Sequence, residues 1–453
     1  MDQPEDVEVI LTDDRRYHFH SSVLARNSSL LASLLTEQTA AKLGPKAKTA
    51  GVKIRWMIEL KKNPHDVDLT GRAWLELVPL DRNGTPNFHP YGIVINENGR
   101  TPTTLFANYE SIFYAFYNRD LPISDDDMPS ALTHVLEILD IAEYLGCIPV
   151  ISKSIDISLL KHGQALYRSI QKMPWGWLGL AMRLKSDVIF QESVVHLAGN
   201  WRKIKEDADA MARMNEMPES VTALCEHLHK GLVTRGKKLE LALSSLYPGS
   251  MAVPFQNLPI RREEYAKDIL VWLALSFFRH WLTQSIILEK GCHAADSGYK
   301  LYSQLGQAGD AYMDRQVISQ FHSKFPMTKK AMNVLENHLL EIKECIRGVV
   351  AEHGILESTC LLDTRRFPVD YMTCVEVKKE DIPWVGRKGS ANTRKRRLGL
   401  EPRRNESSAA AAEYQSEQDE VVEQCEEEAA ADEDEDDLAP EADRERGKRA
   451  RHA

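Results

Sequence analysis

The sequence predicts a small α+β domain, in which a sheet is flanked by helices, followed by a mainly α-helical region and a disordered charged tail. Three observations support this order. The strand-like runs end by residue 98, apolar residues at helical spacing continue to about Trp384, and long blocks of like charge follow. We therefore place the domain boundaries at residues 1–165, 166–385 and 386–453.

The composition is that of an ordinary globular protein with an acidic excess. The chain has 453 residues, of which 43% are apolar, and its formal net charge is −10. This length suits two or three domains, and the negative charge argues against general nucleic-acid binding. The seven cysteines are scattered without a Cys-x-x-Cys pair, which argues against a disulfide framework. The first ten residues are acidic, so we expect no secretory signal.

The opening of the chain predicts a β-hairpin followed by two helices. Residues 7–11 (VEVIL) are apolar and β-branched, and residues 17–20 (YHFH) alternate aromatic and histidine side chains between two faces. The polar stretch TDDRR between them suits a turn. We expect Ser28 to cap the second helix, and Ser21 or Ser22 to cap a shorter helix before it. One face of the second helix is formed by Leu30, Leu31, Leu34 and Leu35.

Two chemical alternatives arise here because His18 and His20 stand beside Ser21 and Ser22. A serine nucleophile would need a third orienting group and an oxyanion site, and nothing nearby in the sequence marks either. A His-x-His pair on a strand puts both rings on one face, which suits zinc, but two ligands do not make a site. We therefore interpret the stretch as the junction between a hairpin and capped helices.

These residues resemble the opening of a BTB/POZ domain, with its strand, turn, strand and hydrophobic helix. Residues 109–123 are similar to the helix and Leu-Pro-Ile corner of such domains, and residues 131–160 to their closing helix pair. Gly146 stands where a glycine would end the first helix of that pair. The positions that carry the resemblance are Asp6, Val7, Tyr17, His20, Val23, Leu24, Ser28, Leu31, Leu35, Tyr144, Leu145, Gly146 and Cys147.

The resemblance implies a non-catalytic module that binds protein partners. Some members of the family form homodimers and others recruit a cullin to a ubiquitin ligase, and the sequence leaves both open. The two halves are separated by an insert at residues 36–103, which contains three strand-like pieces. Only six residues precede Val7, so we do not expect the segment that BTB dimers exchange.

The region after this domain is expected to be helical, and residues 174–204 resemble the segment that follows BTB domains in fungal proteins. Residues 269–288 are apolar enough to test as a membrane span, but Arg279 and His280 lie in the middle. A centred charge costs about 3 kcal/mol on insertion, so we predict a buried core helix and no membrane contact. Further helices are predicted at 217–232, 262–289, 295–319 and 328–353. Core positions are expected for Trp175, Trp177, Trp201, Trp272 and Trp281.

Candidate ligands and catalytic motifs are few. Cys225 and His229 share a helix face, and with Cys292 and His293 they could supply zinc ligands, but their spacing matches no known site. The acidic turn at residues 124–129 is expected to cap the next helix rather than bind a cation. The sequence lacks the phosphate-binding, zinc-protease and serine-hydrolase motifs. We therefore expect no cofactor, metal or catalytic residue.

The C-terminal tail alternates basic and acidic blocks. Residues 411–440 hold 14 acidic residues and no Lys, Arg or His, and blocks of like charge repel, so we expect disorder. The flanking basic stretches resemble nuclear import signals, which favours the nucleus over the cytoplasm. The acidic block opposes direct nucleic-acid binding. The import residues would be Lys388, Arg394, Lys395, Arg396, Arg397, Arg403, Arg404, Arg446, Lys448, Arg449 and Arg451.

The function favoured by the sequence is that of a non-catalytic protein-interaction protein. Such an adaptor or scaffold could present substrates to a cullin-type ubiquitin ligase or act as a nuclear regulator. Two alternatives stay open. One is an enzyme with an unrecognised site in the helical region, and the other is a chromatin-associated protein whose acidic tail holds basic partners.

Overall fold

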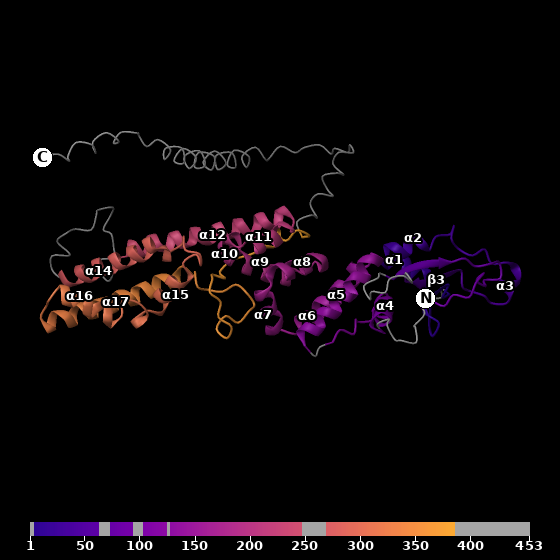
Figure 1. The fold of residues 1–453 in the computed structure, drawn as a ribbon, viewed down its shortest axis with the longest axis horizontal. Helices are drawn as coiled ribbons and strands as arrows, with labels where there is room; N and C mark the ends of the chain where they lie inside the picture. Colours follow the sequence, from indigo (N-terminus) through magenta and orange to yellow (C-terminus); the bar gives the residue numbers. More distant parts are fainter. Residues whose placement is uncertain (1–3, 63–72, 94–102, 125–126, 247–268, 386–453) are drawn as a thin grey trace, which may run out of the picture. The chain divides into compact units, whose positions relative to one another are not determined.

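The structure is a computed structural model, and it describes residues 4–62, 73–93, 103–124, 127–246 and 269–385 (Figure 1). Met1–Gly386 form one unit. The predicted disordered tail, the import residues within it and Cys425 lie outside the described residues.

The N-terminal part contains one four-stranded mixed sheet. Its strands are β1 (Val7–Thr12), β2 (Arg15–Phe19), β3 (Trp56–Lys61) and β4 (Trp74–Val78). The order is β2-β1-β3-β4, in which β1 and β3 are parallel and the other pairs are antiparallel. The predicted hairpin is therefore confirmed, and two strand-like pieces of the insert form β3 and β4. Of the third piece, residues 91–98, Gly92 makes only a bridge to Thr12, and residues 94–98 lie outside the described residues.

Side-chain alternation along β1 explains how the sheet is covered. Val7, Val9 and Leu11 point into the main core, whereas Ile10 points to the opposite face and packs against Met57. Helices pack on the core face. The helices of this part are α1 (Ser21–Asn27), α2 (Ser29–Leu34), α3 (Pro45–Thr49), α4 (Thr103–Ala115), α5 (Met128–Leu145) and α6 (Ile148–Leu160).

The first two helices begin in different ways. The N-cap predicted at Ser28 is confirmed, because its hydroxyl accepts a hydrogen bond from Leu31 N–H at 3.1 Å. The prediction that Ser21 or Ser22 caps α1 is wrong. The Asp6 carboxylate supplies the acceptor instead, with Oδ1 2.7 Å from Ser21 N–H. Asp6 lies before the hairpin, so pairing of β1 with β2 brings it to this helix end.

The remainder of the described chain is helical. Its elements are α7 (Gln164–Lys172), α8 (Pro174–Leu184), α9 (Asp187–Gly199), α10 (Trp201–Glu206), α11 (Ala208–Asn215), α12 (Glu219–Ser244), α14 (Ile269–Ser285), the π-helical η2 (Ile286–Lys290), α15 (Tyr299–Gln307), the 3₁₀ turn η3 (Gly309–Ala311), α16 (Arg315–Lys324), α17 (Lys329–Glu352) and the 3₁₀ turn η4 (Lys379–Asp381). The single helix predicted at 295–319 is wrong. The chain leaves the helical conformation at Ala308 and Met313, both of which have positive φ, and Asp314 caps a new helix.

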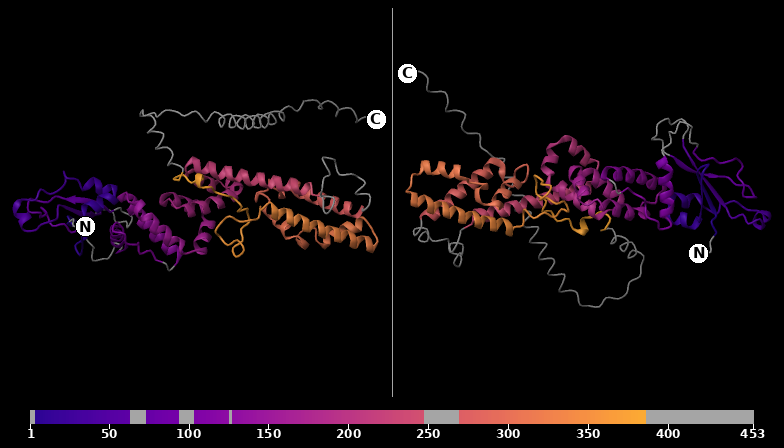
Figure 2. Two further views of the ribbon diagram at one scale, coloured as in Figure 1. Left: turned by 180° about the vertical axis from the view of Figure 1, so that it is seen from behind. Right: turned by 90° about the horizontal axis from the view of Figure 1, so that it is seen from below.

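Two hydrophobic cores meet at α9. The first core joins the sheet to α4–α9, and the second is formed mainly by α12, α14, α15 and α17. Val194 and Leu197 belong to the first core, and Val195 and Ala198 to the second. Both views in Figure 2 show α14 and α17 side by side, and the two helices are in contact. Helix α9 is therefore enclosed by apolar side chains on two sides.

Candidate functional site

The third side of α9 carries polar side chains that are also buried. Glu192, Ser193 and His196 are each at most 2% exposed. The Ser193 hydroxyl donates to the carbonyl oxygen of Ile189 one turn earlier at 2.7 Å. A buried carboxylate and a buried imidazole are costly unless other groups partner them, so the partners of Glu192 and His196 define the site.

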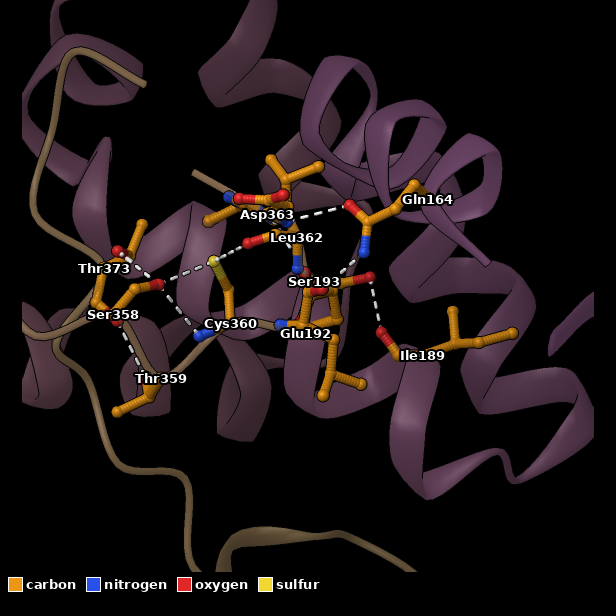
Figure 3. A network of polar contacts seen from close by, with 12 residues as sticks. Gln164, Ile189, Glu192, Ser193, Ser358, Thr359, Cys360, Leu362, Asp363 and Thr373 are labelled. Atoms are coloured by element: carbon orange, nitrogen blue, oxygen red, sulfur yellow. Dashed lines mark hydrogen bonds and ion pairs between the residues drawn. The ribbon is translucent and has the colours of Figure 1, made fainter. Parts of the chain in front are cut away.

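The partners come from residues 353–375, the segment that follows α17 and runs back across α9 (Figure 3). Glu192 accepts hydrogen bonds from the backbone N–H groups of Leu361 at 2.7 Å and Leu362 at 3.1 Å. Gln164 on α7 holds the same segment from the other side. Its amide donates to the Leu361 carbonyl at 3.0 Å and accepts from Asp363 N–H at 2.8 Å.

His196 is oriented by a hydrogen bond between Nδ1 and the Tyr371 hydroxyl, at 2.8 Å. Burial raises the pKa of Tyr371, so the phenol keeps its proton. The other ring nitrogen, Nε2, lies 3.3 Å from Oε1 of Glu192 but makes no hydrogen bond. One edge of the imidazole is thus fixed, and the other faces a carboxylate.

Cys360 completes the cluster. Its thiol lies 2.9 Å from the Ser358 hydroxyl. Figure 3 marks this contact with a dashed line. Glu192, His196 and Cys360 offer an oxygen, a nitrogen and a sulfur that all lie within 4.8 Å of one another, so these three residues could hold a metal ion. Burial raises the pKa of the Cys360 thiol. A catalytic cysteine needs a lowered pKa, so the arrangement does not favour nucleophilic catalysis.

A second set of contacts fixes the rest of this segment. Arg235 on α12 donates to the carbonyl oxygens of Cys374 at 2.6 Å, His353 at 3.2 Å and Gly354 at 3.1 Å. Gly199, the last residue of α9, touches the segment so closely that an added Cβ would lie 2.6 Å from Cδ2 of Tyr371. The segment is therefore part of the packed structure.

A different kind of feature lies on α14 and η2, where large apolar side chains are exposed. Four large apolar side chains of these elements are exposed, Ile269 and Trp272 in the first turn of α14 and Ile287 and Leu288 in η2, and Trp272 is 48% exposed. The exposed polar residues His280, Thr283 and Gln284 lie between the two pairs along the chain. We name the four apolar residues the apolar face. The predicted core position of Trp272 is therefore wrong, whereas Trp177 and Trp201 are buried. The helix predicted at residues 269–288 exists as α14 and η2, but only one of its sides is buried. In the described part of the chain, no helix is long and apolar enough to cross a membrane.

The residues that carried the family resemblance lie where β1, β2, α1 and α2 meet the end of α5. The Ser28 hydroxyl donates to the Leu145 carbonyl at 2.6 Å, and Gly146 ends α5 in the left-handed conformation, with φ of 65°. The Tyr144 hydroxyl accepts from Leu75 N–H at 2.8 Å. His20 contacts the Tyr117 hydroxyl. Buried side chains at this junction are Val7, Leu24, Leu31, Leu35 and Cys147, while Val23 and Tyr17 are partly buried.

The other candidate ligands do not converge. Cys225 and His229 are both buried on α12, but the His229 ring bonds to the Ala198 carbonyl at 3.0 Å. Cys292 instead donates its backbone N–H to Glu240 at 2.6 Å. Burial and the neighbouring Glu240 carboxylate raise the pKa of Cys292 to about 11. The predicted cap before α5 is confirmed at Asp127, which accepts from Ser130 N–H at 2.6 Å.

Stability is expected to fall at acid pH because of His229. Burial lowers the pKa of His229, offset in part by its hydrogen bond to Ala198. As pH falls, the unfolded chain takes up this proton first, near its ordinary pKa of about 6.5. The contribution to stability is therefore complete above that value and is lost as pH falls through the lower, folded-state pKa. Urea unfolding between about pH 7 and pH 5 should show this decline.

The matched variants His229→Gln and His227→Gln separate this effect from other titrations. The glutamine at 229 stays neutral and can still donate to the Ala198 carbonyl, so the pH dependence should become shallower. His227 is exposed two residues away on the same helix, so its replacement should leave the slope unchanged. Equal slopes in all three proteins would contradict the assignment.

The buried cluster was missed in the sequence, although part of its pattern is visible there. Glu192 and His196 stand four residues apart and therefore share a helix face. Nothing local indicates that Cys360 or Tyr371, far along the chain, would come to the same face.

Comparison with known proteins identifies one region. A fungal-type family model described as an FF domain matches residues 248–352, of which the structure describes residues 269–352. This range covers less than half of the chain and includes the apolar face and α14–α17. The comparisons with curated proteins and with solved structures gave no match. FF domains are protein-interaction modules, which supports protein partners in general.

The comparison corrects the expected family. The family match is to an FF domain at 248–352, and residues 1–165 have no match to the BTB/POZ family, so the BTB/POZ identification is wrong. Its motifs, a hairpin, a serine cap and a glycine helix end, are local devices that many small α+β domains need. The expectation of a cullin partner depended on that identification and is withdrawn with it.

Proposed function

We propose that the protein is a non-catalytic adaptor or scaffold that binds a protein partner through the apolar face of α14 and η2. The observation that carries the proposal is the exposure of Ile269, Trp272, Ile287 and Leu288 within the range that matches an FF domain. Exposed apolar clusters on soluble proteins commonly mark interaction sites, and tryptophan is enriched among the residues that dominate binding energy.

The geometry of α14 supports this choice of surface. Its inner side is anchored by Ala274, Leu275, Phe278 and Leu282, all buried in the second core. Ile269 and Trp272 therefore stand on a helix that packing holds in place. A partner that offers apolar side chains of its own could cover them without a large rearrangement.

Affinity purification with mass spectrometry from the cells that express the protein tests the proposal. The wild type is compared with Trp272→Asp and with Trp74→Asp, a control on the edge strand β4, where Trp74 is 39% exposed. We expect the same partner with wild type and control, and at least about tenfold less of it with Trp272→Asp. Equal recovery with both variants would contradict this surface as the binding site.

We further propose that the basic tail directs the protein to the nucleus. The support is compositional: Arg394, Lys395, Arg396 and Arg397 form a dense basic cluster in the sequence. A fluorescent fusion in which these four residues become alanine should shift from nucleus to cytoplasm. The matched control replaces Glu426, Glu427 and Glu428 with alanine and should stay nuclear. A fusion that stays nuclear without the basic cluster would remove this part of the proposal.

A further inference from the structure

The contact between Glu192 and His196 lacks the hydrogen bond that two such buried groups normally make. Nε2 of His196 is fully buried and without a hydrogen-bond partner, although Oε1 of Glu192 is 3.3 Å away. A protonated Nε2 aligned with the carboxylate would donate to it, and an unprotonated one would set two acceptors against each other. A shared cation resolves the contact, because both atoms can then direct lone pairs at it.

We propose that Glu192, His196 and Cys360 bind a divalent cation of the zinc class, which joins α9 to the segment after α17. The ligand set is an imidazole, a carboxylate and a thiolate, the types that zinc accepts in proteins. Two such nitrogen and oxygen ligands around a tetrahedral zinc ion lie about 3.3–3.5 Å apart, which agrees with the observed Nε2–Oε1 separation. The inference does not depend on the proposed function.

The surrounding groups would orient these ligands as outer-shell partners do in metal sites. With Nε2 on the ion, Nδ1 carries the proton and donates to the Tyr371 hydroxyl, at the observed 2.8 Å. The Leu361 and Leu362 amides fix the Glu192 carboxylate and leave it lone pairs for a metal.

Cys360 supplies the third ligand and the route of entry. Its thiol lies within 4.8 Å of the other two ligand atoms. A side-chain rotation that moves the sulfur by about 1 Å would place it within bonding distance of a zinc ion held by those two atoms. Binding releases the thiol proton to solvent as the sulfur coordinates. Cys360 is the only one of the three ligands that is partly exposed, so an ion would approach the cluster from its side.

Metal analysis of the full-length protein after equilibration with Zn²⁺ and removal of free ion tests the site. We expect one zinc per chain in the wild type and in Cys345→Ser, a control whose cysteine lies on α17 with similar exposure. Cys360→Ser should bind zinc at least tenfold more weakly. Equal zinc in both variants, or no zinc in the wild type, would overturn the proposal.

A second measurement needs no variant and covers the case in which Cys360→Ser does not fold. Titration of the metal-free wild type with Co²⁺ should produce the thiolate-to-cobalt charge-transfer absorption that only a sulfur ligand gives. Zn²⁺ should remove this absorption by displacement and raise the midpoint of thermal unfolding. Cobalt uptake without the thiolate band, or no uptake, would exclude Cys360 as a ligand.

Discussion

Glu192→Ala is expected to lower the free energy of unfolding by about 2–4 kcal/mol, because it removes the acceptor of two backbone N–H groups. The loss is about 1–3 kcal/mol for the buried N–H of Leu362 and about 1 kcal/mol for that of Leu361, which is half exposed. The carboxylate is 2% exposed, so water cannot easily replace it. Urea unfolding followed by circular dichroism measures the change. The segment after α17 should also become more sensitive to proteolysis than the rest of the chain, because it loses its contacts with α9.

The matched control for this variant is Glu226→Ala on α12. Glu226 also accepts from a partner, Lys205 at 2.7 Å, but this ion pair is exposed, so its loss should cost no more than about 1 kcal/mol. Similar losses in the two variants would show that the Glu192 contacts with the segment contribute little to stability.

A Gly199→Ala variant is expected to lose about 1–3 kcal/mol of stability through overpacking. The new methyl group would meet the Tyr371 ring and the Met372 carbonyl oxygen, so the segment must move away from the end of α9. That movement would also disturb the hydrogen bond between Tyr371 and His196. Thermal or urea unfolding gives the magnitude.

The opposite sign is expected for Gly231→Ala in α12. An added Cβ at Gly231 meets nothing within 4 Å, and alanine favours the helix over glycine by about 0.5–1 kcal/mol. This variant should therefore be more stable than the wild type. If Gly199→Ala were stabilising as well, this result would contradict the close contact between Gly199 and the segment after α17.

The parts of the fold that depend on neighbouring residues could be predicted from the sequence. The hairpin of β1 and β2, the caps at Ser28 and Asp127 and the helix end at Gly146 follow from a few adjacent residues each. Asp6 could not be predicted as the cap of α1, because it reaches that helix only through the pairing of β1 with β2.

The parts that depend on distant segments were missed or misjudged. Glu192 and His196 show their shared face in the sequence, but Cys360 and Tyr371 reach it only through the return of the chain after α17. Trp272 was expected in the core because it lies in a long apolar run of the sequence. Local pattern cannot tell which of two apolar sides finds a partner within the chain.

The wrong identification as a BTB/POZ domain has the same origin. The strand, turn, strand and capped helix at the start of the chain arise from local packing needs and do not identify a family. The range that a family model does match, 248–352, has an irregular pattern, with a π-helical turn at η2 and a break between α15 and α16.

Hydrogen–deuterium exchange of the full-length protein, alone and with the partner recovered by purification, tests the central claim most directly. We expect the partner to slow exchange in residues 269–290, which contain the apolar face, and to leave the β-sheet unchanged. Protection confined to the sheet or to α1–α6, with none at α14 and η2, would contradict binding through the apolar face.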